Sequence, residues 1–180
     1  CSLIGKMPGE YDDKFSSMRL FFAYMMAHPG KKLLFMGSEF GQFKEWAYKE
    51  GLDWLLLDYE KHRQLQAFSK ELNHFYTAHP ALWQIDYSWE GFQWISSDDN
   101  SNSVIAFRRI DRDGKDLITV FNFTPNDHED YRIGVPEKGT YKVVMDTALK
   151  KYGGTKPRLC GTYKTKKIPM HNMEQSISLK

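Results

Sequence analysis

The carboxylates best placed to do chemistry stand in one loop, directly after a short apolar run. Glu39 follows the run Leu33–Met36, and Glu45 and Asp53 come later in the same loop. Active sites of α/β folds lie in the loops that follow parallel strands. Glycoside chemistry needs two carboxylates, one to donate a proton and one to attack or to activate water. The loop is therefore a candidate site for sugar chemistry, although the residues alone also admit, and favour, a structural Glu39 that accepts backbone N–H groups.

Aromatic side chains are interleaved with the charged residues of this loop. They are Phe43, Trp46, Tyr48 and Trp54. Sugar rings stack their flat C–H faces on Trp, while their hydroxyls bond to nearby carboxylates and amides. Glu39, Trp46, Asp53 and Trp54 are the candidate substrate-binding residues, and they either contact the sugar or support the loop. The alternative is that these rings cover the core, which is the commoner use of aromatic side chains.

Other chemistry-bearing segments give weaker signals. Seven basic residues lie between Lys150 and Lys167, with no acidic residue from Asp146 to Glu174. This stretch fits a groove for a phosphate backbone, but a solvated loop beside an edge strand is the favoured interpretation. The six histidines are scattered and no CxxC or HExxH motif occurs. We therefore expect neither a metal site nor another cofactor.

Helices are expected on both sides of the carboxylate loop. Apolar residues from Phe15 to Met26 recur at helical spacing, and His28-Pro29-Gly30 should end that helix. The unbroken apolar run Leu33–Met36 is typical of a buried strand in a parallel sheet. A second amphipathic helix should begin near Asp58. One such strand with two helices cannot bury both of its faces, so the pattern predicts a larger α/β body before residue 1.

The pattern changes to strict alternation after Leu82. Short alternating runs follow one another, with turn signals such as Asp111–Gly114 and Glu137–Thr140 between them. Strands of this length and spacing predict an antiparallel β-sandwich. The fold class is therefore α/β followed by all-β.

Composition excludes several classes of protein. In 180 residues, 41% are hydrophobic and 27% charged, which excludes a disordered or fibrous chain. The net charge of +2 does not indicate nucleic acid as the partner. The longest apolar run, Leu20–Ala27, is far shorter than the ~18 residues that span a bilayer, so no membrane partner is expected. Two cysteines and no visible secretory signal fit a cytoplasmic location.

Several segments of the sequence, in the same order, resemble the bacterial 1,4-α-glucan (glycogen) branching enzymes of the α-amylase superfamily. The segments are Ser2–Gly9 (SLIGKMPG), Ala27–Gly37 (AHPGKKLLFMG), Ser38–Gln42 (SEFGQ), Glu45-Trp46, Leu52–Trp54 (LDW) and Asn122–Pro125 (NFTP). The resemblance covers most of residues 2–135, and residues 147–175 match poorly.

The resemblance implies a fold and a reaction. Residues 1–81 would be the closing, incomplete piece of a catalytic (β/α)8 TIM barrel, with Leu33–Met36 as its last strand, and residues 82–180 the C-terminal β-sandwich. Such enzymes cut an α-1,4-glucan and rejoin the piece through an α-1,6 linkage, by a retaining mechanism. The family's catalytic carboxylates all belong to segments before position 1, so no catalytic residue is assigned here. We expect a chain inactive alone, whose partners are α-1,4-glucan or glycogen and the missing part of the barrel.

A second function class is compatible with the same residues. The β half and its aromatic side chains also fit a non-catalytic glucan-binding module. Retardation in a glycogen-containing gel distinguishes a binding module from an inert fragment.

Overall fold

The computed structural model describes residues 2–180, which form two compact units. The helical unit contains residues 2–78 together with Met145–Leu159, and the sheet unit contains His79–Val144 and Cys160–Lys180. Residues 145–159 thus pack with the helices, whereas the division expected at residue 81 assigned them to the second domain. Each unit is described by itself below.

Three α-helices build the helical unit. They are α1 (Leu3–Lys6), α2 (Tyr11–Ala27) and α3 (Glu60–Ala78), with short 3₁₀ turns η1 (Ser38–Phe40), η2 (Trp54–Asp58) and η5 (Lys150–Tyr152). The backbone N–H of Glu10 donates to the Asp13 carboxylate at 3.0 Å, which starts α2. Helix α2 ends at Ala27, before the extended His28 that precedes Pro29. Both long helices expected from the apolar periodicity are therefore present.

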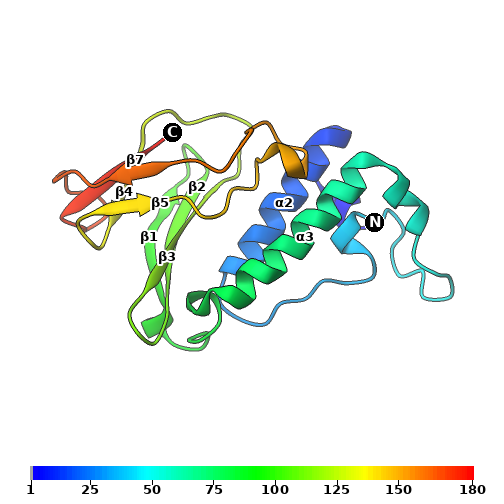
Figure 1. Ribbon diagram of the computed structural model, residues 1–180, viewed down its shortest axis with the longest axis horizontal. Coiled ribbons are helices and arrows are strands. Elements are labelled where there is room, and N and C mark those ends of the chain that lie inside the picture. The colour runs from blue at the N-terminus through cyan, green and yellow to red at the C-terminus, as the bar shows by residue number, and fades with distance from the viewer. Residues whose placement is uncertain (1) are drawn as a thin grey trace. The chain divides into compact units, whose positions relative to one another are not determined.

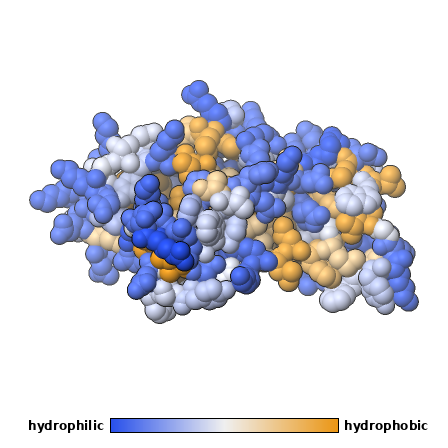
Figure 2. All heavy atoms as spheres, turned by 60° about the horizontal axis from the view of Figure 1, so that its bottom comes forward, coloured by the Kyte–Doolittle hydropathy of each residue, from blue (hydrophilic) through white to orange (hydrophobic). Residues whose placement is uncertain are grey.

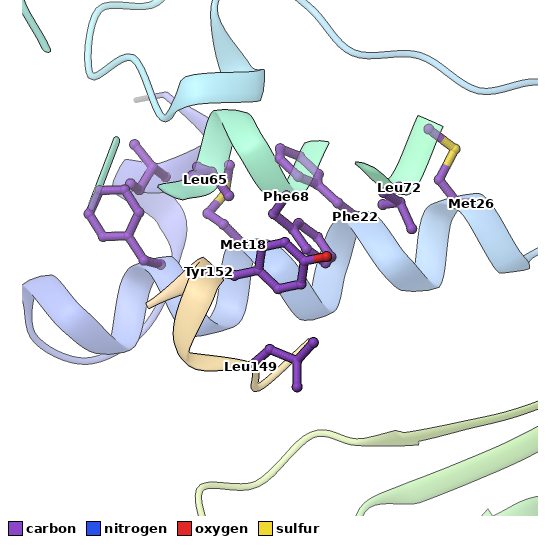
Figure 3. Packing of buried hydrophobic residues seen from close by; sticks show 10 residues of the cluster. Met18, Phe22, Met26, Leu65, Phe68, Leu72, Leu149 and Tyr152 are labelled. Carbon is purple, nitrogen blue, oxygen red and sulfur yellow. The ribbon is translucent and has the colours of Figure 1, made fainter. Parts of the chain in front are cut away.

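The core of this unit forms between α2 and α3, which lie side by side in Figure 1. Figure 3 shows the apolar faces of the two helices meeting, with two side chains from the η5 segment closing the cluster. The labelled residues are Met18, Phe22, Met26, Leu65, Phe68, Leu72, Leu149 and Tyr152. Each large apolar side chain buried here contributes about 1.5–3 kcal/mol relative to an exposed one. The return segment Met145–Leu159 is thus part of the core and not an appendage.

A buried arginine ties this return segment to α2. Arg19 is 3% exposed, and its Nε donates to the Thr147 carbonyl at 2.7 Å while Nη1 donates to the Tyr152 carbonyl at 2.9 Å. Burial disfavours the charged guanidinium and lowers the pKa of Arg19. Together with the buried Leu149 and Tyr152, Arg19 therefore holds residues 145–159 in the helical unit.

The segment Leu33–Met36 differs from the sequence prediction. It forms no strand, and Leu33 and Phe35 are 74% and 44% exposed. A parallel strand needs neighbours that accept and donate its backbone hydrogen bonds. Among residues 2–180 no strand pairs with this segment. The prediction of a buried strand is wrong for the chain as it stands: Leu33 and Phe35 are exposed, Leu34 packs against the helical core, and Met36 lies in a turn with a φ of 38°.

The sheet unit begins with a three-stranded antiparallel sheet in the order β1-β2-β3. Its strands are β1 (Phe92–Asp99), β2 (Val104–Ile110) and β3 (Asp116–Asn122), and two 3₁₀ turns, η3 (Pro80–Leu82) and η4 (Trp89–Gly91), precede them. Asp111 Oδ1 accepts the backbone N–H groups of Asp113 and Lys115, which fixes the expected turn between β2 and β3.

Four shorter strands complete the sheet unit. Strand β4 (Tyr131–Val135) pairs with β7 (Gln175–Leu179), and β5 (Thr140–Lys142) pairs with β6 (Thr162–Lys164), all antiparallel. Ile95 and Ala106 of the first sheet share a buried cluster with Ile133, Val135 and Ile177 of β4 and β7. Two packed antiparallel layers confirm the predicted all-β second half (Figure 1).

No helix within residues 2–180 is long and apolar enough to cross a membrane.

Candidate functional site

The candidate site is the loop of residues 37–54, called here the rim loop, which lies between α2 and α3, contains η1 and ends at the first residue of η2. Two glycines with positive φ, Gly37 at 80° and Gly41 at 74°, flank η1 and let the chain turn tightly on each side. Phe40 of η1 is fully buried. The loop therefore starts from a fixed base although most of its later side chains are exposed.

Helix α3 holds that base through two backbone carbonyls. Ser69 Oγ donates to the Glu39 carbonyl at 3.0 Å, and His62 Nδ1 lies 2.7 Å from the Phe40 carbonyl. His62 is 1% exposed and contacts the rings of Phe15 and Phe43 edge-on. His62 is thus a core residue that orients the loop.

Gln42 links the two ends of the rim loop. Its side chain is 4% exposed, Oε1 accepts the Asp53 N–H at 2.9 Å, and Nε2 donates to the Lys44 carbonyl at 3.3 Å. Its own N–H donates to the Gly37 carbonyl at 3.0 Å. In the sequence, Gln42 stands out only as the last residue of the segment Ser38–Gln42, and this structural role was not predicted. Nothing in the sequence marks the Gln42 side chain as buried. Its place next to Gly41 was the only sign of a structural role.

The carboxylates of Glu39 and Asp53 are half-buried, and among residues 2–180 no hydrogen bond or ion pair engages either of them. Glu39 and Asp53 are held instead through their backbones. This geometry does not support the alternative in which the Glu39 carboxylate staples the loop by accepting N–H groups. The two carboxylates remain available to a ligand.

The two tryptophans keep one ring face toward the protein and remain open to solvent. Trp46 is 66% exposed and lies 5.1 Å from the Phe35 ring, while Trp54 is 55% exposed and stacks on Phe40 at 5.3 Å. Trp46 also adopts a φ of 58°, a left-handed backbone that costs a non-glycine residue about 1–2 kcal/mol. Strain of this kind persists where the surroundings impose it.

The four predicted site residues do not converge on one cavity. A cavity of about 220 Å³ is lined by Trp46 with Ser38 and Gln42, by Glu45, and by apolar residues of α2 and of 33–36. Glu39, Asp53 and Trp54 are not among its lining residues. Asp53 and Trp54 instead lie against Gln42 and Phe40. The rim loop therefore presents two neighbouring patches on one framework.

A larger cavity of about 530 Å³ lies in the sheet unit and was not expected from the sequence. Asp98, Asp99 and Tyr131 are among its lining residues, together with His128 and His171. The Tyr131 hydroxyl donates to Asp99; burial, with this bond to a carboxylate, raises the pKa of Tyr131 to about 12. Among residues 2–180 no group of His, Cys, Asp or Glu is arranged to hold a metal ion.

The basic stretch between Lys150 and Lys167 is divided between the two units at residue 159. Lys151 Nζ pairs with Glu71 at 2.8 Å, and Lys156 Nζ pairs with Asp146 at 2.9 Å. These ion pairs fit the structural interpretation of the stretch.

Comparison with known proteins places these elements in a family context. Residues 94–180 match the family model described as "Alpha amylase, C-terminal all-beta domain". Over 179 residues the chain is 50% identical to the 1,4-alpha-glucan branching enzymes of Halothermothrix orenii and of Aquifex aeolicus. Over 178 residues it is 45% identical to the branching enzyme of Thermosynechococcus vestitus.

These alignments take up nearly all of this chain but a small part of each relative. They cover 99% of the chain for the first two relatives and 98% for the third, yet only 28%, 28% and 23% of the relatives' own lengths. Residues 94–180 are thus similar to the alpha-amylase C-terminal all-beta domain, and nearly the whole chain is similar to a C-terminal part of the 1,4-alpha-glucan branching enzymes.

Proposed function

We propose that this chain is the C-terminal part of a 1,4-α-glucan branching enzyme that transfers α-1,4-glucan chains to form α-1,6 branches in glycogen. The observation that carries the proposal is 50% identity to named branching enzymes along 99% of the chain. Residues 1–81 are proposed to close a (β/α)8 barrel, and residues 82–180 to form the C-terminal β-sandwich. The proposed location is the cytoplasm.

The exposed apolar segment supports the barrel assignment. Leu33 and Phe35 are open to solvent, and Phe21 of α2 is 42% exposed. Figure 2 shows hydrophobic side chains gathered at the surface between hydrophilic ones. In the proposed barrel, Leu33–Met36 pairs with a neighbouring parallel strand, and these side chains become buried. Apolar surface of this kind is otherwise costly to leave in water.

The proposed reaction is a retaining transglycosylation. One carboxylate attacks the anomeric carbon while an acid protonates the leaving oxygen. The 6-hydroxyl oxygen of another glucan then attacks the same carbon, releases the carboxylate and gives its proton to the former acid, which now acts as the base. We assign these carboxylates to parts of the enzyme that this chain does not contain. The chain alone is accordingly proposed to be inactive.

The rim loop is proposed to contact the glucan near the catalytic end of the barrel. Trp46 and Trp54 offer exposed indole faces for sugar rings, and Glu39 and Asp53 offer carboxylate oxygens for sugar hydroxyls. Gln42 positions Asp53 by accepting a hydrogen bond from its backbone N–H. A site held by buried polar groups and presenting open side chains is preorganised for binding.

A branching assay tests the proposal. The purified 180-residue chain is incubated with amylose, and α-1,6 linkages are counted after debranching; none are expected. The full-length enzyme should form them, and its Trp46→Ala and Trp54→Ala variants should turn over long glucans more slowly. Branch formation by the chain alone, or no branch formation by the full-length enzyme, contradicts the proposal.

A further inference from the structure

A histidine of the sheet unit accepts a hydrogen bond from the backbone of a strand. The Gly134 N–H of β4 donates to His171 Nδ1, and the two nitrogen atoms lie 3.1 Å apart. A ring nitrogen accepts a hydrogen bond only when it carries no proton, so this bond requires a neutral imidazole. The bond to β4 is therefore linked to the protonation state of one half-buried side chain.

The Gly134 N–H points away from the strand that pairs with β4. Gly134 lies opposite Ser176 of β7. The backbone of Ser176 bonds instead to Lys166, with N···O distances of 2.9 and 3.0 Å. In an antiparallel pair, opposed residues that exchange no bonds direct their backbone groups outward. His171 thus supplies the acceptor on the side of β4 that β7 does not cover.

A tight turn places His171 against β4. Met170 and Met173 exchange backbone hydrogen bonds of 2.9 and 3.1 Å, and His171 and Asn172 between them adopt φ values of 50° and 61°. Two-residue turns of this kind favour Asn and Gly, which adopt positive φ most readily. A Cβ at Gly134 would collide with the Met170 carbonyl oxygen, so the turn packs directly on β4. The turn therefore carries backbone strain that its contacts with β4 offset.

Two carboxylates offer a protonated His171 another partner. His171 lines the cavity of about 530 Å³, and so do Asp98 and Asp99 at the end of β1. Burial lowers the pKa of His171 from its ordinary value of 6.5, and the charges of Asp98 and Asp99 oppose this effect in part. The neutral ring suits the bond to Gly134, whereas the charged ring suits the two carboxylates.

The remaining ionisable groups of the cavity add to its negative charge. Those from the segment before β4 and from β4 itself are Asp127, His128, Glu129, Asp130, Tyr131 and Arg132. Arg132 Nη1 donates to Ser176 Oγ at 2.9 Å, and the Tyr131 hydroxyl donates to Asp99. His128 Nε2 lies 3.1 Å from the Asn102 carbonyl oxygen. Five carboxyl groups and one arginine line the cavity, so its field attracts a proton to His171.

We propose that His171 is a pH-sensitive latch, which holds the turn of residues 170–173 on β4 and releases it on acidification. A proton from solvent binds Nδ1, which then cannot accept the Gly134 N–H. The charged ring turns toward Asp98 and Asp99, and the strained turn moves away from β4. The latch needs no glucan and does not rest on the proposed function.

The direction of the pH effect follows from the lowered pKa. The folded protein binds this proton less readily than the unfolded chain does. The contribution of His171 to stability is therefore complete above about pH 6.5 and is lost as the pH falls through the pKa of the folded state. Ordinary carboxyl groups titrate near pH ~4, so their protonation is separable from that of the histidine.

Hydrogen exchange in the full-length protein tests the latch between about pH 8 and pH 5, with rates corrected for intrinsic exchange. Protection of residues 131–135 should fall about tenfold on acidification, the effect of losing one hydrogen bond. His171→Asn should abolish this fall, because an amide oxygen accepts the N–H at every pH and asparagine tolerates positive φ. His171→Ala should reduce protection at both pH values. His128→Asn is the matched control from the same cavity, and it should keep the fall.

Four results would overturn the latch. The first is equal protection of residues 131–135 at both pH values in the parent protein. The second is a fall of the same size in His171→Asn, because another group would then be the sensor. The third is full protection in His171→Ala at pH ~8. The fourth is an equal fall throughout α2 and α3, which would mark general acid unfolding.

Discussion

Gln42, Arg19 and Arg109 are polar side chains that the fold buries, and each of them holds a backbone segment in place. Gln42 fixes the rim loop and Arg19 fixes the return segment. Arg109 fixes residues 86–91 through the Asp86 carboxylate and the Gly91 carbonyl. A buried polar group is costly unless it is hydrogen-bonded. Substitution at these positions therefore disturbs geometry at a distance from the side chain itself.

Gln42→Leu should loosen the rim loop without unfolding the chain. The variant leaves the Asp53 N–H and the Lys44 carbonyl without their side-chain partner, at a cost of about 1–3 kcal/mol. Limited proteolysis between residues 43 and 53 should become faster. Gln66→Leu on α3 is the control, and equal cleavage rates in the two variants would contradict the role given to Gln42.

The raised pKa of Tyr131 predicts that the sheet unit becomes less stable at alkaline pH. Its pKa of about 12 exceeds the ordinary value of 10, so the folded state keeps a proton that the unfolded state loses between these values. Stability from this group is complete below pH 10 and is lost as the pH rises to about 12. Urea titrations should show a weaker pH dependence for Tyr131→Phe in this range. A pH dependence identical to that of the parent chain counts against the prediction.

Ligand contact by Glu39, Trp46, Asp53 and Trp54 stays a prediction; their exposure could be expected from the sequence, but the framework that holds them could not. Exposed Trp46 and Trp54 and unengaged Glu39 and Asp53 follow from a polar loop with interleaved aromatics. Burial of Gln42 depends on contacts between positions eleven residues apart, which no local pattern reveals.

At the scale of elements, local periodicity predicted the helices and strands whose formation depends on contacts close in the sequence. Helices α2 and α3 and the alternating strands appear where the apolar spacing placed them. The strand predicted at Leu33–Met36 is absent because a parallel strand exists only beside neighbouring strands. The return of Met145–Leu159 to the helices depends on Arg19, more than a hundred positions earlier, and no periodic signal carries that information.

Arg19→Met should release the return segment. The half-buried Thr147 carbonyl and the buried Tyr152 carbonyl lose their donor, and we expect the free energy of unfolding to fall by about 2 kcal/mol. Amide hydrogens in residues 145–159 should exchange faster. Arg63→Met is a matched control, because Arg63 also donates to two carbonyls, those of Leu57 and Asp58, but at an exposed position. Equal destabilisation by both substitutions would show that burial does not set the cost.

At the scale of the whole molecule, the strands of the sheet unit pair with one another, whereas the apolar run Leu33–Met36 of the helical unit has no strand beside it within residues 2–180. The proposed barrel explains this difference, because an antiparallel sandwich closes its own core whereas a single βα piece does not. Stability measured on the 180-residue chain is therefore expected to differ from stability measured on the full enzyme.

Leu33→Ser tests this contrast. In the 180-residue chain, where Leu33 is 74% exposed, the substitution should leave the melting temperature unchanged and reduce binding of a hydrophobic dye. In the full-length enzyme it should destabilise by about 2–5 kcal/mol, as truncation of a buried leucine does. Leu55→Ser, at 73% exposure, is the control. An equal, small effect of Leu33→Ser in both proteins would argue against a barrel strand.

The return of Met145–Leu159 sets the order in which a newly made polypeptide can finish its folding. The residues around Phe15 and Phe68 emerge from the ribosome long before Leu149 and Tyr152, and residues 79–144 are made in between. At ~5–20 residues per second, translation leaves the hydrophobic core of the helical unit incomplete for several seconds. During this interval the helical core lacks two of its buried side chains, and a messenger truncated before the codon for Leu149 would never supply them.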